Sequence, residues 1–269
     1  MALSGMILAF TILLWVIILD NLVLGIFLLI RAFQFKFNNL YSIGIGFVLF
    51  FVGLFINFIL GLGYSYQEIY TSIGYFLIAI FTFLTFNKEK EGYQAKLILY
   101  IILILMVVRM SLALAIEIDI NPPIRHFERT IITCYVFLIF YWLGWSSIST
   151  FKRLRNREIA PWIKIRYKTI SFVSFLYPFS VIMIPFVPWD TEFGDPSNLL
   201  SFIQFAITVI LSLIFIIGMT IAWIIPKQLR NYLNRKKGYK PSKDTDLTED
   251  ELMQLILDQL KGADDNGND

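Results

Sequence analysis

Seven long apolar stretches alternate with short polar connections along the 269-residue chain. Each stretch is close to the roughly 20 residues with which a helix crosses the hydrocarbon core of a bilayer, and none shows the alternation of a lipid-facing barrel strand. Backbone that faces lipid must satisfy its own hydrogen bonds, which a helix does. The pattern therefore predicts an all-α membrane protein, a seven-transmembrane helix bundle. The stretches lie near residues 4–30, 39–62, 68–86, 97–116, 130–150, 169–188 and 198–225.

Lysine and arginine residues fall almost entirely on one side of this predicted bundle. The first, third and fifth connections and the C-terminal tail hold 20 of the 23 basic residues. The other side holds only Arg125 and Arg129, and Arg109 lies inside the fourth stretch. Since cytoplasmic loops carry the excess of positive charge, the N-terminus is predicted outside and the C-terminus in the cytoplasm. The net charge of +3 thus reflects sidedness, and no nucleic-acid binding is expected.

The C-terminal region changes character after the last apolar stretch. Residues 1–226 are predicted to form the transmembrane domain, 227–246 a basic juxtamembrane linker, 247–262 an acidic amphipathic cytoplasmic helix, and 263–269 a disordered tail. A helix this short is marginal in water, so its apolar face is expected to bind a cytoplasmic protein or the basic inner surface of its own bundle. That face comprises Met253, Ile256, Leu257 and Leu260.

Several kinds of chemistry have no support in the composition. One histidine, His126, leaves too few ligands for a zinc hydrolase, and the last apolar stretch contains no lysine for a retinal Schiff base. The single cysteine, Cys134, excludes a disulfide within the chain. We therefore expect no enzymatic activity, no metal and no cofactor.

Charged residues at membrane depth are costly and usually functional, which draws attention to Asp20 and Arg109. With the first helix running inward and the fourth outward, their depths differ by only about 5–8 Å, which an arginine side chain spans. A buried ion pair between them is predicted. It would either fix the register of the helices or form a proton or cation site.

Polar residues also gather in the two longer connections of the predicted outer side. Turn-forming prolines lie among charges of both signs, so these connections are expected to close over the outer mouth of the bundle and to recognise a ligand. The candidate residues are Glu117, Asp119, Arg125, His126, Glu128, Arg129, Trp189 and Asp190.

In the sixth stretch, Pro178, Pro185 and Pro188 predict a kink that could act as a hinge.

The longest predicted inner connection, around residues 151–168, is strongly basic. It is expected to lie against anionic lipid headgroups with Trp162 at the interface, or else to bind a cytoplasmic protein. The lipid-facing basic residues are Lys152, Arg153, Arg155 and Arg157.

These features favour a receptor-like or sensory protein that couples an outer pocket to the basic loop and the tail helix. A transporter or channel that uses the Asp20–Arg109 pair is the first alternative, and a scaffold subunit of a membrane complex is the second. An integral, multi-pass location is predicted, most simply in the plasma membrane.

Overall fold

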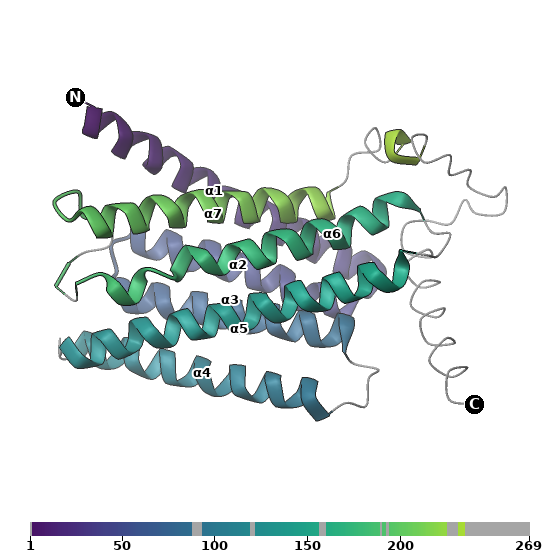
Figure 1. Cartoon of the computed structure of the whole chain (residues 1–269), viewed down its shortest axis with the longest axis horizontal. Coiled ribbons are helices and arrows are strands. Elements are labelled where there is room, and N and C mark those ends of the chain that lie inside the picture. The colour runs from purple at the N-terminus through teal and green to yellow at the C-terminus, as the bar shows by residue number, and fades with distance from the viewer. Residues whose placement is uncertain are drawn as a thin grey trace.

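The computed structural model is a bundle of long helices that lie side by side along one direction (Figure 1). It describes residues 2–87, 93–118, 122–155, 160–188, 190–191, 194–224 and 231–234. The helices are α1 (Ala2–Phe35), α2 (Asn38–Phe58), α3 (Tyr64–Phe86), α4 (Tyr93–Ile118), α5 (Pro122–Leu154), α6 (Pro161–Leu176) and α7 (Leu199–Trp223), with the short 3₁₀ helices η1 (Tyr177–Val181) and η2 (Ile184–Phe186) between α6 and α7.

Seven helical segments of the described chain are long and apolar enough to cross a membrane, α6 and its 3₁₀ continuation forming one of them. The predicted seven-helix transmembrane bundle is confirmed. Its sidedness stays a prediction from the positive charges. The C-terminal segments predicted beyond α7, including the apolar face of the tail helix, lie outside the described residues.

Six of the helices form a ring, and α4 lies outside it. Contacts join α1 to α2, α2 to α3, α3 to α5, α5 to α6, α6 to α7, and α7 back to α1, while α4 packs against α3 and α5. The outward face of α4 is apolar and exposed, with Tyr100 at 63% and Ile104 at 62% exposure. Arg109 on the same helix is only 1% exposed. A peripheral helix therefore directs its arginine into the bundle.

Glycines let α1, α2 and α3 approach closely. A Cβ atom on Gly25 of α1 would lie 3.0 Å from the carbonyl oxygen of Gly44 on α2. A Cβ atom on Gly46 of α2 would lie 3.0 Å from the carbonyl oxygen of Gly74 on α3. Small residues at such crossings let helices pack backbone against backbone in a membrane.

The α-helical part of the sixth span ends at Leu176, two residues before Pro178. Proline has no N–H and its ring clashes with the carbonyl of the preceding turn, so the chain continues as η1 and η2. Side chains from neighbouring helices bind the backbone of this segment. Gln204 and Thr208 donate to the carbonyl oxygen of Ser180, and the Thr133 hydroxyl donates to that of Val181 at 3.1 Å. The predicted kink is thus a change of helix type.

Two connections are shorter than the sequence indicates, because the flanking helices extend further. The helix α4 runs through Ile118 and α5 begins at Pro122, so the expected outer loop is largely helical. On the other side, α6 begins at Pro161. Trp162 is therefore 4% exposed inside the first turn of α6, so its side chain packs within the protein, and its predicted depth at the lipid interface stays a prediction.

Candidate functional site: a cavity within the bundle

A cavity of about 550 Å³ lies inside the helix ring. Its lining comes from α1, α2, α3, α4, α5, η1, η2 and α7, including the last residues of α2 and the first turns of α3 and α5. It therefore lies toward the end of the bundle that the charge pattern predicts to be outside. Its volume is within the range of ligand pockets, about 300–1,000 Å³.

Aromatic side chains lie beneath the cavity, at its boundary with the rest of the core. The hydroxyls of Tyr75 and Tyr177 are 2.8 Å apart, and the ring of Tyr177 is 4.5 Å from that of Phe140 and 4.7 Å from that of Phe215 between centroids. Below this layer, Phe47 and Phe81 are at most 1% exposed. We call the layer of Tyr75, Phe140, Tyr177 and Phe215 the aromatic floor.

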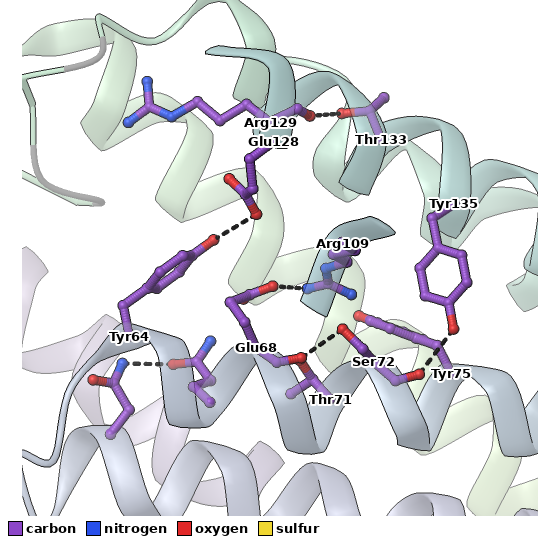
Figure 2. Close-up of polar contacts among 12 residues, drawn as sticks. Tyr64, Glu68, Thr71, Ser72, Tyr75, Arg109, Glu128, Arg129, Thr133 and Tyr135 are labelled. Carbon is purple, nitrogen blue, oxygen red and sulfur yellow. Dashed lines mark hydrogen bonds and ion pairs between the residues drawn. The ribbon is translucent and has the colours of Figure 1, made fainter. Parts of the chain in front are cut away.

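A buried ion pair joins Glu68 of α3 to Arg109 of α4 on the wall of the cavity (Figure 2). Glu68 is 2% exposed and Arg109 is 1% exposed. Two charges at this depth are tolerated because each compensates the other. Arg109 has the buried carboxylate partner that the sequence predicts, but from α3.

The predicted Asp20–Arg109 pair is wrong. Asp20 lies on α1 and accepts a hydrogen bond from the Thr220 hydroxyl of α7 at 3.1 Å. The helix α1 packs against α2 and α7, whereas α4 packs against α3 and α5 from outside the ring, so a match in depth does not bring their side chains together. Asp20 is not part of the cavity lining.

Arg109 also lies against two aromatic rings. Its guanidinium carbon is 5.7 Å from the ring centre of Tyr75 and 5.8 Å from that of Tyr135, distances at which a cation is attracted to a ring face. Tyr135 is itself fixed, because its hydroxyl donates to the backbone oxygen of Ser72 at 2.8 Å (Figure 2). In the described part of the chain, Nε and Nη1 of Arg109 have no hydrogen-bond partner.

Glu128 of α5 is the second buried carboxylate of the cavity and is 1% exposed. Its one hydrogen bond comes from the hydroxyl of Tyr64 at 3.4 Å, a long distance for an O–H donor (Figure 2). Among the described residues no lysine, arginine or histidine forms an ion pair with it. An ionised carboxylate in such a place is strongly destabilised unless it gains a partner.

Arg129 is the next residue on α5, but its guanidinium does not form an ion pair with Glu128. It donates to the backbone oxygens of Val187, Pro188 and Thr191, the last two at 2.9 and 3.4 Å. In Figure 2 its side chain extends away from Glu128. Arg129 thus fixes the connection between η2 and α7 over the cavity.

The remaining outer candidates do not form one cluster. Arg125 lines the cavity and is half-buried, whereas His126, Glu117 and Asp190 are exposed and lie outside its lining. Glu117 accepts a hydrogen bond from the Ser65 hydroxyl at 2.7 Å. Asp119 and Trp189 lie outside the described residues.

Beyond the helix ends, the loop before α7 has a short turn of its own. The hydroxyl and backbone N–H of Ser197 donate to Asp195 at 2.7 and 2.8 Å, which holds the pKa of this carboxyl below its usual value.

At the opposite end of the bundle, Lys152, Arg153 and Arg155 are exposed at the end of α5, as a headgroup contact requires. Arg157 lies outside the described residues. Arg166 of α6 is buried, donates to the backbone oxygen of Ala222 at 2.9 Å and lies over the ring of Trp162 at 4.9 Å. This contact ties the inner end of α6 to that of α7.

Sequence reasoning missed Glu68, Tyr64 and Gln204 as parts of the site. A signal for the first two is present, since Tyr64, Glu68, Thr71 and Tyr75 recur at helical spacing on α3 and form one polar stripe in an apolar helix. Gln204, fully buried on α7, has no such companions and is recognised only from the broken helix beside it.

The fold and the cavity define the class: a multi-pass membrane protein of seven helices with a buried polar site inside the bundle. Comparison with protein-family models, curated proteins and solved structures finds no match for the chain.

Proposed function

We propose that the chain is a ligand-sensing membrane protein, which binds a small molecule in the cavity and passes the change to its inner face through the broken sixth span. The observation that carries the proposal is the cavity with the buried, unpaired carboxylate of Glu128 on its wall. A helix bundle has no structural need for such a group.

The composition of the cavity wall supports binding of a small organic molecule. Most of the lining is apolar, with Leu54, Ile132 and Val209 among its members, and the polar groups are few. Ligand sites typically combine apolar walls with a small number of polar groups that fix the orientation of the ligand. The aromatic floor supports a site that is accessible from one side of the bundle.

The sixth span supports a route for the signal. Tyr177 is both the first residue of η1 and a member of the aromatic floor, while Val181 and Ile184 line the cavity. A ligand that contacts this segment would displace the outer end of α6, whose inner end is tied to α7 by Arg166. We propose that α6 pivots about this contact.

Transport is the second candidate, and the broken helix favours it. Transporters commonly bind substrate where a discontinuous helix lines a cavity at membrane depth. The segment from Tyr177 to Phe186 lies at such a position beside the ion pair of Glu68 and Arg109.

The first test asks whether the cavity binds a ligand. Full-length protein would be purified from native membranes in mild detergent, and bound small molecules identified by mass spectrometry. Ile132→Trp fills the cavity, whereas Ile104→Trp on the exposed face of α4 is the matched control. A molecule recovered with wild type and Ile104→Trp but lost with Ile132→Trp supports the proposal; equal recovery from all three would contradict it.

A second test separates sensing from transport. The recovered molecule would be offered, isotopically labelled, to sealed proteoliposomes. Saturable binding without accumulation in the lumen supports a sensor, whereas accumulation that Ile132→Trp abolishes supports a transporter. Hydrogen exchange of residues 161–187 with and without the molecule checks the pivot of α6, which predicts altered exchange near Tyr177.

We further propose that residues 247–262, for which the sequence predicts an acidic amphipathic helix, contact a cytoplasmic partner. Deletion of residues 246–262 is expected to abolish recovery of that partner from cell membranes while membrane insertion remains intact. Unchanged recovery would remove the tail from the signalling route.

A further inference from the structure

We infer that the ligand of the cavity is a small organic cation, an amine with an apolar body whose ammonium group pairs with Glu128; this inference rests on the proposed function. The nearest charges to consider are Glu68, Arg109, Arg125 and Arg129, which surround Glu128 from three helices.

Glu68 and Arg109 are already occupied with each other. Two guanidinium nitrogens of Arg109 have no hydrogen-bond partner among the described residues, but they are buried, and the guanidinium carbon lies over the rings of Tyr75 and Tyr135. An anionic ligand would have to break this arrangement to reach them. The charges of this ion pair therefore cancel, and the pair presents no net charge to the cavity.

Arg129 is occupied as well, because three backbone oxygens accept its hydrogen bonds. Hydrogen bonds that involve an ionised group are about twice as strong as neutral ones, so these contacts hold the guanidinium in place. Glu128 therefore stays without a counter-ion beside a neighbouring arginine.

Apart from the buried nitrogens of Arg109, the unpaired groups of the lining are the hydroxyl of Ser180, which can donate or accept, and two acceptors. Glu128 has one long hydrogen bond, and Oε1 of Gln204 has no partner within the described part of the chain. Gln204 cannot turn its amide freely, since its nitrogen donates to Ser180 and Thr208. A molecule that donates hydrogen bonds and carries positive charge matches this set, and a carboxylate does not.

The size of the cavity favours an organic cation over an inorganic one. A volume of about 550 Å³ with mostly apolar walls is far larger than a metal ion or ammonium needs. The apolar surface of an amine with an aromatic or branched body would fill it.

Arg125 sharpens the inference, because it is the one cation of the lining that forms no hydrogen bond or ion pair among the described residues. It lies one helical turn before Glu128 on α5 and repels an ammonium group at that site. Its removal should therefore strengthen binding of a cation and weaken binding of an anion.

The test uses three probes of one length: 4-phenylbutylamine, 4-phenylbutan-1-ol and 4-phenylbutanoate. At neutral pH the amine is protonated and the acid ionised. Binding to full-length protein in lipid nanodiscs would be measured by calorimetry for wild type, Glu128→Gln, Arg125→Gln and the control Glu117→Gln. Glu117 is a matched control because it is an exposed glutamate outside the cavity.

The amine is expected to bind wild type at least about tenfold more tightly than the alcohol, as a charge-assisted hydrogen bond implies. Glu128→Gln should abolish this preference without weakening the alcohol, Arg125→Gln should increase affinity for the amine, and Glu117→Gln should change neither. Tighter binding of the acid, or an amine preference that survives Glu128→Gln, overturns the inference.

The outcomes also distinguish this inference from the proposed function. If the alcohol or the acid binds wild type at least as tightly as the amine and Ile132→Trp prevents it, the cavity is a ligand site and only the charge of the ligand is wrong. If none of the three probes binds and no molecule copurifies with wild type, both the inference and the proposed function fail.

Discussion

Single charges decide most of the chemistry of this bundle, and the pair of Glu68 and Arg109 is the strongest case. Loss of one partner leaves a charge buried without compensation, whereas loss of both does not. We expect Glu68→Gln or Arg109→Met alone to reduce the free energy of unfolding by about 3–5 kcal/mol. The double variant should lose less than the sum, as thermal unfolding in detergent would measure.

Asp20 provides the control for this comparison of single and double variants. Because Asp20 bonds to Thr220 and not to Arg109, Asp20→Asn combined with Arg109→Met should be additive. Coupling between these two positions would show that the ring arrangement of the helices is wrong.

Glu128 should reduce stability in the ligand-free protein. Glu128→Gln keeps the shape and removes the unpaired charge, so we expect the free energy of unfolding to rise by about 1–3 kcal/mol. Glu117→Gln, at an exposed position where an amide oxygen can still accept the hydrogen bond from Ser65, should change it by less than about 0.5 kcal/mol. Thermal unfolding without added ligand measures both, and a destabilised Glu128→Gln would contradict the absence of a counter-ion.

Sequence reasoning identified Arg109 and Glu128 but not their surroundings. Depth along a helix can be estimated from the apolar boundaries, which is why Asp20 and Arg109 looked compatible. Which helices are neighbours depends on packing around the ring, and no local pattern in the sequence encodes it. Glu68 was missed because α3 begins at Tyr64, one turn earlier than its apolar residues suggest.

At the scale of elements, η1 depends on side chains that replace the missing helix bonds. Gln204 and Thr208 both donate to the carbonyl oxygen of Ser180. Either one alone keeps that oxygen satisfied, so Gln204→Leu and Thr208→Val should each have a small effect. The double variant should lose about 1–3 kcal/mol and show faster hydrogen exchange over residues 177–187.

Thr150→Val is the control for this pair of substitutions. Thr150 donates to Ser146 within its own helix α5, so its loss removes a hydrogen bond without touching η1. Equal exchange in the control and the double variant would mean that the two side chains do not hold the 3₁₀ segment.

The elements themselves were largely predictable. Apolar length gave the seven spans, and the prolines of the sixth span gave the position where its α-helix ends. The ends of α4, α5 and α6 were not predictable, because the charged residues at these ends continue the helix on its polar face. Arg125 and Glu128 look like loop residues in a hydropathy pattern, yet they occupy the first turns of α5.

For the whole molecule, sidedness can be tested with one background substitution, because Cys134 is the single cysteine. In Cys134→Ala, a membrane-impermeant maleimide applied to intact cells should label Ser197→Cys, which is exposed before α7. Arg153→Cys, exposed at the other end, should react only after permeabilisation. The reverse result would place the cavity on the cytoplasmic side.

The arrangement around the ring also bears on how the protein is made. Glu68 and Arg109 belong to consecutive helices, α3 and α4, so their charges can meet before α5 to α7 have been synthesised. An arginine at the centre of a helix opposes membrane insertion by about 2.5–3.5 kcal/mol. Entering as a hairpin with α3, α4 would carry that arginine already neutralised. We therefore expect the ion pair on the cavity wall to act earlier as well, by lowering the cost of inserting the outermost helix into the bilayer.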